Sequence, residues 1–386
     1  MIDERIVISN LSDKIILIYL LNDEPQQIKA YSISELTEGL RLGAIVNCRI
    51  TKRLAGVNGC FLRYKKDGNG FINGDFKCES VHPFMYVKEG ANDKKPLFVK
   101  ELEISGHFSV VKLDGKCDLR ISSKLNKADT NALRENFKDL AIQNNISILL
   151  RTSCKDASLE LIEEEIKKNA GILNDILSKV DKRQDGYVFY SPSSLIVRDL
   201  SEIIKTRNVE IITDKKEIYD EIKEAVDDEL KYAKDLISLR LYEDKLLDLS
   251  KLYRFEGIMS KALSRKVMLK DNAFLTFDRT EALIAIDVNS SGMILKNGTK
   301  EEANLKLNLL AAKEAIHQII LRNYSGIIII DFINMNEEES YEVLRNELNS
   351  LLSKDVVKSK FHGFTNLGLA EISRQRKELS LSEKMR

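Results

Sequence analysis

The sequence has no excess of either charge sign. Lysine plus arginine and aspartate plus glutamate number 60 each in 386 residues, so the formal net charge at pH 7 is zero. A strongly basic chain would indicate nucleic acid as the partner. Because that excess is missing, any phosphate contact must come from a local patch. With 43% hydrophobic and 31% charged residues, the composition is typical of a soluble globular chain.

Paired cysteines and clustered histidines are also lacking. The five cysteines form no C-x-x-C pair; they are Cys48, Cys60, Cys78, Cys117 and Cys154. An odd cysteine count without a secretion signal predicts free thiols in a reducing cytoplasm. The four histidines stand alone in the sequence; they are His82, His107, His317 and His362. No zinc site is evident, and structural roles are the simpler interpretation.

No hydrophobic run is long enough to cross a membrane. The run Ile15–Leu21 has seven residues, which predicts a buried strand and no membrane span. Neither G-x-x-x-x-G-K-[ST] nor G-x-G-x-x-G occurs, which argues against a nucleotide-binding doubly wound domain. The length predicts two or three domains.

The most informative stretch is residues 281–335. Two short, nearly continuous apolar runs, within Leu283–Val288 and Ile327–Ile330, lead to Asp287 and Asp331. Such runs predict strands of a sheet that is covered on both faces. Between them, turn residues at 290–292 and 297–298 precede an amphipathic helix with apolar residues at 305, 309, 312, 316 and 319. A strand–helix–strand crossover joins parallel strands, so both aspartates are expected at one edge of the sheet.

The two aspartates predict a cation site. Carboxylates on neighbouring strands lie ~4.8 Å apart and repel unless a cation or a shared proton lies between them. Mg²⁺ favours such oxygen ligands together with a substrate phosphate. Asn289 is two residues beyond Asp287 and can orient a carboxylate or a water. The alternative is that each aspartate only caps the turn or helix that follows it.

Four segments resemble the catalytic region of the ribonuclease E/G family: Thr280–Ser290, Asn308–Glu314, Gly326–Ile333 and Glu371–Arg376. The resemblance implies an endoribonuclease of RNA processing and decay. Asp287 and Asp331 would hold the catalytic Mg²⁺, with Mn²⁺ able to substitute, and Asn289 would support them. The substrate would be single-stranded RNA, AU-rich and 5′-monophosphorylated, cut to leave 5′-phosphate and 3′-hydroxyl ends. The family usually has an aspartate where this chain has Asn334, so activity could be weakened.

The resemblance also implies a multidomain α/β fold. A ribonuclease H-like subdomain would carry an inserted S1-like OB barrel and a 5′-sensor region, followed by a DNase I-like α/β catalytic subdomain. The expected boundaries are 1–35 and 203–265 for the ribonuclease H-like parts, 36–112 for the barrel, 113–202 for the sensor region and 266–386 for the catalytic subdomain.

Residues 36–112 read as short strands with frequent turns, a pattern that suits a small antiparallel barrel; the last of these strands begins at His107. Phe61 and Phe71 lie among basic residues, so bases could stack while cations follow the backbone. The alternative places the aromatics in the core and the basic residues on a solvated rim. The resemblance implies that Phe61 and Phe71 contact RNA.

The strand predicted at Ile146–Leu150 ends at Arg151 and Thr152, where basic and hydroxyl groups can hold a phosphate. An arginine at a strand end can equally make a surface ion pair. The resemblance implies that Arg151 and Thr152 form a pocket for the 5′-monophosphate of RNA. The family usually has glycines after this pair, whereas this chain has Cys154–Ala157.

The rest of the chain gives simpler signals. An amphipathic helix is predicted at 159–180, with Glu163–Glu165 and Lys167–Lys168 on a solvated face. Strands are predicted at Ser193–Arg198 and Val209–Thr213, a charged helix at 215–235, and helical structure at 247–266.

Arg374 and Arg376 are candidate phosphate contacts, with ion pairing as the alternative. The chain ends before the place where the family has its zinc-linking C-P-x-C motif, so we expect a monomer, or a dimer built by another surface in place of a zinc-linked one. The rival to an enzyme is an RNA-binding adaptor of the same fold.

Overall fold

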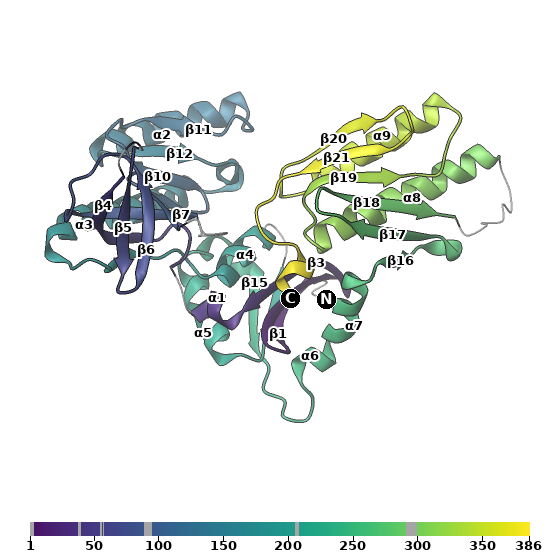
Figure 1. The fold of residues 1–386 in the computed structure, drawn as a ribbon, viewed down its shortest axis with the longest axis horizontal. Coiled ribbons are helices and arrows are strands. Elements are labelled where there is room, and N and C mark those ends of the chain that lie inside the picture. Colours follow the sequence, from purple (N-terminus) through teal and green to yellow (C-terminus); the bar gives the residue numbers. More distant parts are fainter. Residues whose placement is uncertain are drawn as a thin grey trace. The chain divides into compact units, whose positions relative to one another are not determined.

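The computed structural model describes residues 4–37, 40–54, 56, 58–88, 95–204, 208–290 and 299–386. The chain divides into two compact units (Figure 1). The first comprises Met1–Thr37, Glu202–Glu224 and Asp235–Arg386, and the second comprises Glu38–Ser201 and Ala225–Lys234. The N-terminal segment and the C-terminal half of the chain therefore fold together. The five-part division expected from the sequence remains a prediction.

One sheet of the first unit combines the N-terminal hairpins with two later strands. Its order is β15-β14-β1-β2-β3, with β1 (Glu4–Leu11), β2 (Lys14–Leu21), β3 (Glu24–Ser32), β14 (Val209–Thr213) and β15 (Ile237–Leu241). The hairpin strands are antiparallel, whereas β1, β14 and β15 run parallel. Asn22 and Asp23 both have positive φ, 51° and 62°, which suits the two-residue turn between β2 and β3. The buried strand predicted at Ile15–Leu21 and the strand predicted at Val209–Thr213 are confirmed.

Several helices accompany this sheet: α1 (Ile33–Thr37), α5 (Lys216–Asp227), α6 (Leu249–Leu252), α7 (Phe255–Leu263) and α10 (Leu381–Lys384). The 3₁₀ helix η3 (Lys231–Leu236) belongs mostly to the second unit. Phe255 and Met259 of α7 and Leu381 of α10 share one core with the hairpin strands. The charged helix expected over 215–235 ends at Asp227 and resumes as the 3₁₀ turn.

The second sheet of the first unit holds the two aspartates. Its order is β16-β17-β18-β19-β21-β20, with β16 (Lys266–Met268), β17 (Phe274–Arg279), β18 (Leu283–Asn289), β19 (Gly326–Asp331), β20 (Ser359–Phe364) and β21 (Ala370–Arg374), and the 3₁₀ turn η4 (Lys270–Asn272) joins the first two. β18 and β19 are parallel neighbours joined by α8 (Lys300–Leu321), so the predicted crossover is confirmed.

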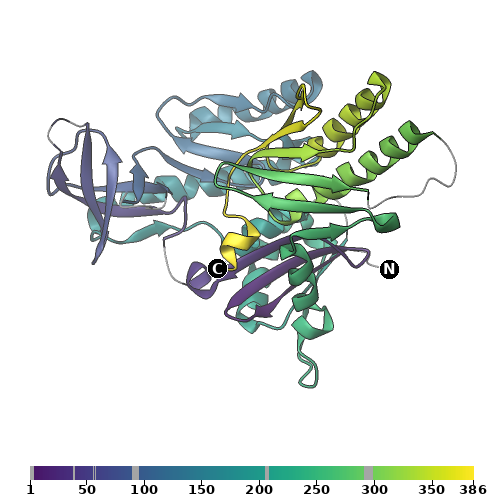
Figure 2. The same ribbon diagram turned by 45° about the vertical axis from the view of Figure 1, so that its right-hand side comes forward.

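Both helices that accompany this sheet, α8 and α9 (Glu338–Ser353), pack in a single core with one of its faces (Figure 2). Ile286 and Ile330 point into that core, whereas Ile327 on the other face is 55% exposed. The expectation of a sheet covered on both faces was therefore wrong. The apolar runs look continuous because isoleucines and an alanine occupy positions of both faces, although only one face is deeply buried.

Helix α8 begins with a capping box, in which Thr299 and Glu302 satisfy each other's backbone N–H groups. The turn residues predicted at 291–292 and 297–298 lie outside the described residues.

The second unit contains a closed five-stranded barrel of OB-like topology. Its strands are β4 (Ile45–Arg53), β5 (Gly59–Lys65), β6 (Gly68–Asn73), β7 (Val81–Lys88) and β8 (Leu97–Val99), and β13 (Val188–Tyr190) extends it beside β4. The pairing of β4 with both β5 and β7 closes the barrel. The predicted barrel is confirmed, except that β6 and β8 pair in parallel. Phe84 and Phe98 fill its core.

A separate four-stranded sheet in this unit has the order β11-β12-β10-β9, with β9 (Leu102–Ser105), β10 (Ser109–Leu113), β11 (Leu119–Ile121) and β12 (Ser147–Leu150). The strand that follows His107, which the pattern groups with the barrel, belongs here, because β10 pairs with β9 and β12. The helices α2 (Lys127–Gln143) and α3 (Leu159–Lys179) share its core, and the 3₁₀ turns η1 (Thr152–Asp156) and η2 (Val180–Lys182) follow β12 and α3.

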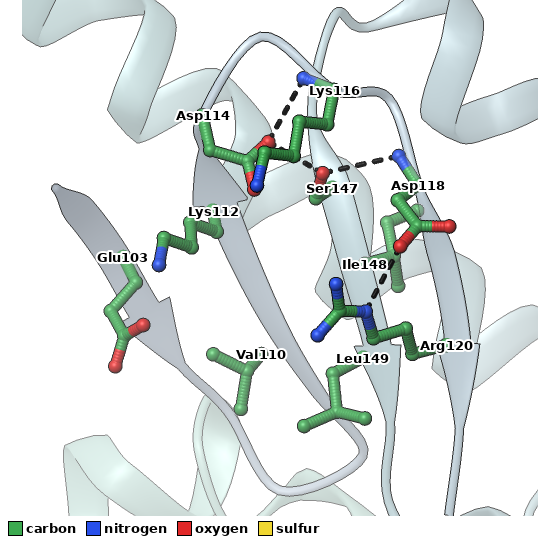
Figure 3. A pocket seen from close by; sticks show the side chains of 10 residues that line it. All are labelled: Glu103, Val110, Lys112, Asp114, Lys116, Asp118, Arg120, Ser147, Ile148 and Leu149. Carbon is green, nitrogen blue, oxygen red and sulfur yellow. Dashed lines mark hydrogen bonds and ion pairs between the residues drawn. The ribbon is translucent and has the colours of Figure 1, made fainter.

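The other face of this sheet has a hollow of about 230 Å³ (Figure 3). Three basic and three acidic side chains line it: Lys112, Lys116, Arg120, Glu103, Asp114 and Asp118. The charges balance, and Arg120 is already paired with Asp118 at 2.9 Å. The hollow therefore has no excess charge that would favour an anionic or a cationic ligand.

Residues 193–198 were wrongly predicted as a strand. The chain forms the helix α4 (Leu195–Ile203), and the Ser194 hydroxyl accepts the N–H of Val197. Ile196, Val197 and Leu200 are buried at helical spacing. The β-branched residues favour a strand locally, but burial of this helical face decides the outcome.

No helix of the described residues is long and apolar enough to cross a membrane.

Candidate active site

Asp287 lies two residues before the end of β18, Asp331 is the last residue of β19, and the two are direct register partners on these parallel strands. Neighbouring strands lie ~4.8 Å apart, and register partners point to the same side of a sheet. Ile286 and Ile330 face the helices, so both aspartates lie on the opposite, open face, where both are exposed. The predicted juxtaposition of the two aspartates is therefore present.

Asn289 lies on the same face, because side chains two residues apart on a strand point the same way. Its amide Nδ2 donates a hydrogen bond to Oδ2 of Asp287. Among the described residues, the carboxylate of Asp331 has no hydrogen-bond or ion-pair partner. Neither aspartate caps a turn or helix of the described chain, and within it no basic side chain forms an ion pair with either carboxylate.

The loop after Asp331 is fastened by a residue that the sequence did not single out. Asn308 of α8 is fully buried, and its amide group exchanges two hydrogen bonds with the backbone of Ile333, 2.8 and 3.0 Å long. Glu301 accepts the backbone N–H groups of Asn336 and Glu337. An asparagine within the apolar side of a predicted helix was the available signal. Asn334 itself is exposed in this loop.

The donor set suits a hard divalent cation. Mg²⁺ is commonly held by one or two carboxylates, with water and substrate phosphate supplying its other ligands. Asp287, Asp331 and the Asn289 carbonyl oxygen are all hard oxygen donors on one exposed face. Within the described ranges, there is no cluster of three or more histidine, cysteine, aspartate or glutamate side chains that could hold a metal ion. A site with two carboxylates therefore depends on substrate oxygens to complete it.

Of the two candidate phosphate-binding arginines, Arg374 does not face the solvent. It is 4% exposed, and its guanidinium binds Asp355 at 2.8 Å, Asn323 at 2.8 Å and the carbonyl of Tyr324 at 2.9 Å. The expectation of a phosphate contact was wrong for Arg374, and the ion-pairing alternative holds. Arg376 is exposed and binds Glu383 at 3.2 Å.

Arg151 and Thr152 follow β12 and are both exposed. The Thr152 hydroxyl lies 2.9 Å from that of Ser122, which the sequence did not single out. Within the described part of the chain, the guanidinium of Arg151 makes no hydrogen bond or ion pair, so the surface ion pair is not formed there. An unpaired guanidinium and hydroxyl groups from consecutive residues are groups that can bind a phosphate.

The turn beside Arg151 is held by a carboxylate. Glu165 of α3 accepts the backbone N–H groups of His107, Phe108 and Ser109 and the Ser109 hydroxyl, at 2.7–3.2 Å. A Cβ on Gly106 would lie 2.3 Å from this carboxylate, so a larger residue there would displace the carboxylate from its hydrogen bonds. The prediction that Glu165 belongs to a solvated face was wrong. Three glutamates follow one another in the sequence, and the sequence does not show which of them accepts hydrogen bonds from backbone N–H groups of another segment.

The turn at residues 107–109 also binds the segment around Arg151. The Phe108 carbonyl accepts the Arg151 N–H at 2.8 Å, and the His107 carbonyl accepts the Ser153 hydroxyl at 2.6 Å. The His107 ring stacks on Tyr232 with centroids 3.6 Å apart. Burial, together with the nearby positive Arg151, lowers the pKa of His107 to about 4, so this histidine is neutral at pH 7.

In the barrel, Phe61 and Phe71 are register partners on β5 and β6, and their rings meet edge to face at 6.2 Å. Both are half-buried, and Nζ of Lys95 lies 4.7 Å from the Phe61 ring centroid. A Cβ on Gly59 would lie 2.5 Å from the Phe71 ring, so glycine makes room for it.

Several of the basic residues around these aromatics are already paired. Arg63 binds Asp185 at 2.7 Å, and Arg49 binds the same carboxylate at 3.4 Å. The hydrogen bond from Arg63 and then that from Arg49 outweigh the effect of burial and hold the pKa of Asp185 below its usual range. The basic rim is therefore partly neutralised.

The fold and site define a multidomain α/β protein with an OB-like barrel and a strand-end carboxylate pair suited to a divalent cation. The model of the ribonuclease E/G family matches residues 103–377. The chain therefore belongs to the ribonuclease E/G family.

Curated relatives agree with this family. Ribonuclease G of Haemophilus influenzae is 34% identical over 266 residues, covering 68% of this chain and 52% of that protein. Ribonuclease E of Buchnera aphidicola is 27% identical, with 77% and 30% covered, and ribonuclease G of Salmonella typhimurium is 27% identical, with 75% and 58% covered. The chain thus spans less than two thirds of the length of each of these relatives.

Proposed function

We propose that this chain is a Mg²⁺-dependent endoribonuclease that cuts single-stranded RNA and leaves 5′-phosphate and 3′-hydroxyl ends. The observation that carries the proposal is the carboxylate pair Asp287 and Asp331, which are register partners on the open face of one sheet. Membership of the ribonuclease E/G family supports the reaction class. AU-rich, 5′-monophosphorylated RNA and a role in RNA processing and decay belong to the same proposal, as does replacement of Mg²⁺ by Mn²⁺.

Each residue has a defined role in this proposal. Asp287 and Asp331 would hold the ion, Asn289 orients the Asp287 carboxylate, and Asn308 holds the loop that follows Asp331. When bound, the divalent ion supplies a Lewis acid that polarises a phosphoryl oxygen and lowers the pKa of a bound water. No protein base within the described residues is required for that chemistry.

Substrate binding is assigned to the second unit. Phe61 and Phe71 offer ring faces and edges to bases, with Lys95 beside them for the backbone. Arg151 and Thr152, with Ser122, receive the 5′-monophosphate. In the first unit, Arg376 is kept as a phosphate contact, since Glu383, its one partner among the described residues, is itself shared with Arg279.

The subdomain assignments follow the same proposal. The sheet of β1–β3, β14 and β15 corresponds to the ribonuclease H-like subdomain and that of β16–β21 to the DNase I-like subdomain. The barrel corresponds to the S1-like domain, and the sheet of β9–β12 to the 5′-sensor region.

The decisive test replaces each metal-binding carboxylate. Asp287→Asn and Asp331→Asn keep the shape of the side chain but remove its charge. We expect each to lower the cleavage rate of a labelled single-stranded RNA roughly 10³-fold, or about 4 kcal/mol of transition-state stabilisation. Gel-shift affinity for RNA is expected to stay largely intact.

Asp278→Asn is the matched control, because Asp278 is an exposed aspartate on the same sheet and pairs with Arg265 at 2.6 Å. It is expected to cut within a few-fold of the unchanged chain. Undiminished cutting by both metal-site variants would refute the metal assignment.

The second candidate is a catalytically weak RNA-binding adaptor, which Asn334 favours because the family usually has an aspartate there. Incubation of 5′-labelled AU-rich RNA with Mg²⁺ or with chelator separates the two. Metal-dependent fragments support the enzyme, whereas a retained shift without fragments supports the adaptor. If the missing acid limits activity, Asn334→Asp raises the rate.

A further inference from the structure

Two rows of side chains cross the open face of the catalytic sheet. Register pairing places Lys266 opposite Thr276, Thr276 opposite Asp287, and Asp287 opposite Asp331. Two residues away on the same strands, Met268 lies opposite Phe274, and Phe274 lies opposite Asn289. Side chains two residues apart on a strand lie on one face, ~6.8 Å apart. A polar, charged row and a largely apolar row therefore run side by side.

The second row puts an aromatic ring on the open side of the sheet. Leu275 and Phe277 of the same strand are buried in the core, so Phe274 must point away from it. Phe274 is half-buried, and Met268 beside it is 59% exposed. Directly opposed residues of an antiparallel pair have Cβ atoms about 5 Å apart, so Phe274 adjoins Asn289 at the carboxylate pair.

Lys266 completes the arrangement. Its Nζ lies 3.5 Å from the centroid of the Phe274 ring, so cation and ring are in contact. Within the described ranges Lys266 has no carboxylate partner, and its charge is therefore available to an anion. A cation over an aromatic ring, next to the acids that would hold a divalent ion, combines the two features that single-stranded nucleic acid requires: a stacking surface and a phosphate contact.

We propose that Lys266, Phe274 and Met268 form a nucleotide subsite for single-stranded RNA beside the carboxylate pair. One base next to the cut stacks on Phe274 and Met268. Lys266, with the Thr276 hydroxyl, contacts the phosphate backbone along the polar row. The subsite rests on the proposed function and adds to it a contact with a base adjacent to the scissile phosphate.

The first test pairs a side chain with a base. A single-site RNA substrate is prepared intact and as a series in which one nucleotide near the cut lacks its base. Base–aromatic stacking predicts that one such deletion lowers kcat/KM of the unchanged chain roughly 10-fold. Phe274→Ala is expected to lower kcat/KM on intact RNA by a similar factor and to be insensitive to that same deletion. Additive losses at every position, or normal cutting by Phe274→Ala, would overturn the subsite.

The second test addresses the cation. Lys266→Ala is expected to raise KM with little change in kcat and to reduce the salt dependence of RNA binding by about one unit of slope. Lys266→Arg keeps the charge and restores binding. Lys360→Ala is the matched control, because Lys360 is an exposed lysine on the outermost strand at the opposite edge of the sheet. Equal effects of Lys266→Ala and Lys360→Ala would contradict the proposal.

A readout that does not need cleavage separates this inference from the proposed function. RNA with 2-aminopurine at the stacked position is bound to the Asp287→Asn variant, with or without Phe274→Ala. Quenching that depends on Phe274 supports the subsite even if no RNA is cut. Absence of quenching while the unchanged chain still cleaves RNA rejects the subsite alone. Thermal unfolding of each variant verifies that it is folded.

Discussion

At the residue scale, Arg374 shows how burial changes the role of a charged side chain. The side chains of Arg374 and Asp355 are 3% and 1% exposed, and Nε of the arginine lies 2.8 Å from Oδ2 of the aspartate. Burial alone would raise the pKa of Asp355, but the hydrogen bonds from Arg374 and Ser359 outweigh it and hold the pKa below its usual range. The pair is fully hydrogen-bonded, so its role is structural.

Removing one partner of this pair leaves the other charge buried and unpaired. We expect Arg374→Met to lower the free energy of unfolding by about 3–5 kcal/mol at pH 7, measured by urea denaturation. Arg345→Met is the control, because Arg345 pairs with Glu342 on the surface at 3.0 Å, and its loss is expected to cost less than about 1 kcal/mol.

The same pair gives the sign of a pH effect. The pKa of Asp355 is lower in the folded chain than the unfolded value of about 3.9. Its stabilising contribution is therefore complete above pH ~4 and is lost as the pH falls through the folded pKa. Arg374→Met should remove this part of the acid sensitivity. A variant as stable as the unchanged chain at pH 7 would show that the pair contributes no net stability.

At the scale of the element, helix α10 depends on one glutamate. Glu383 forms a capping box with Ser380 and an ion pair with Arg279 at 2.6 Å. Although burial raises its pKa, the hydrogen bonds from Ser380 and Arg279 lower the pKa to about 2. Leu381 of the same helix is buried in the core with the hairpin strands. Charge on Glu383 therefore stabilises the docking of this helix.

Glu383→Gln is expected to lower the free energy of unfolding by about 1–2 kcal/mol at pH 7, because a partly exposed pair is screened by solvent. Since the folded pKa is depressed, this contribution is present above pH ~4.3 and is lost between pH ~4.3 and about 2. Urea denaturation of both chains at pH 7 and pH 3 measures it. Glu342→Gln, which removes an exposed pair, should show no such difference; a loss as large in that control would contradict the assignment.

At the scale of the whole molecule, the candidate metal site is separate from the cores. Asp287 and Asp331 lie on an exposed face, while the core of their sheet is formed by apolar residues of the strands, α8 and α9. Metal binding should therefore support catalysis without being needed for folding, unlike a structural zinc site.

We accordingly expect chelation to abolish RNA cleavage while far-UV circular dichroism stays unchanged. Mg²⁺ at ten times its Kd stabilises by only about 1.4 kcal/mol, which moves Tm by a few degrees. Thermal unfolding with Mg²⁺ and with chelator measures this. Loss of structure on chelation would mean that the ion holds the fold together.

Local patterns in the sequence were sufficient for most elements. Spacing alone predicted the apolar strands at 283–288 and 327–330, the helix between them and the aspartates near the strand ends. These predictions led to the candidate metal site. The same local pattern failed at Leu195–Ile203, where β-branched residues form a helix. It also failed to separate the exposed positions of the sheet from the buried ones, because Ile327 and Ile328 are the same residue type on opposite faces.

The sequence by itself determined most of the strands and helices, with α4 as an exception, because hydrophobic periodicity is a property of neighbouring residues. Only the tertiary structure decided that Asp287 and Asp331 share an open face, that Arg374 is buried against Asp355, that Glu165 binds the turn at residues 107–109, and that Lys266 lies over Phe274 beside the carboxylates. Each of these depends on which strand or helix pairs with which, and that choice is made by the burial of apolar surface between segments distant in the chain.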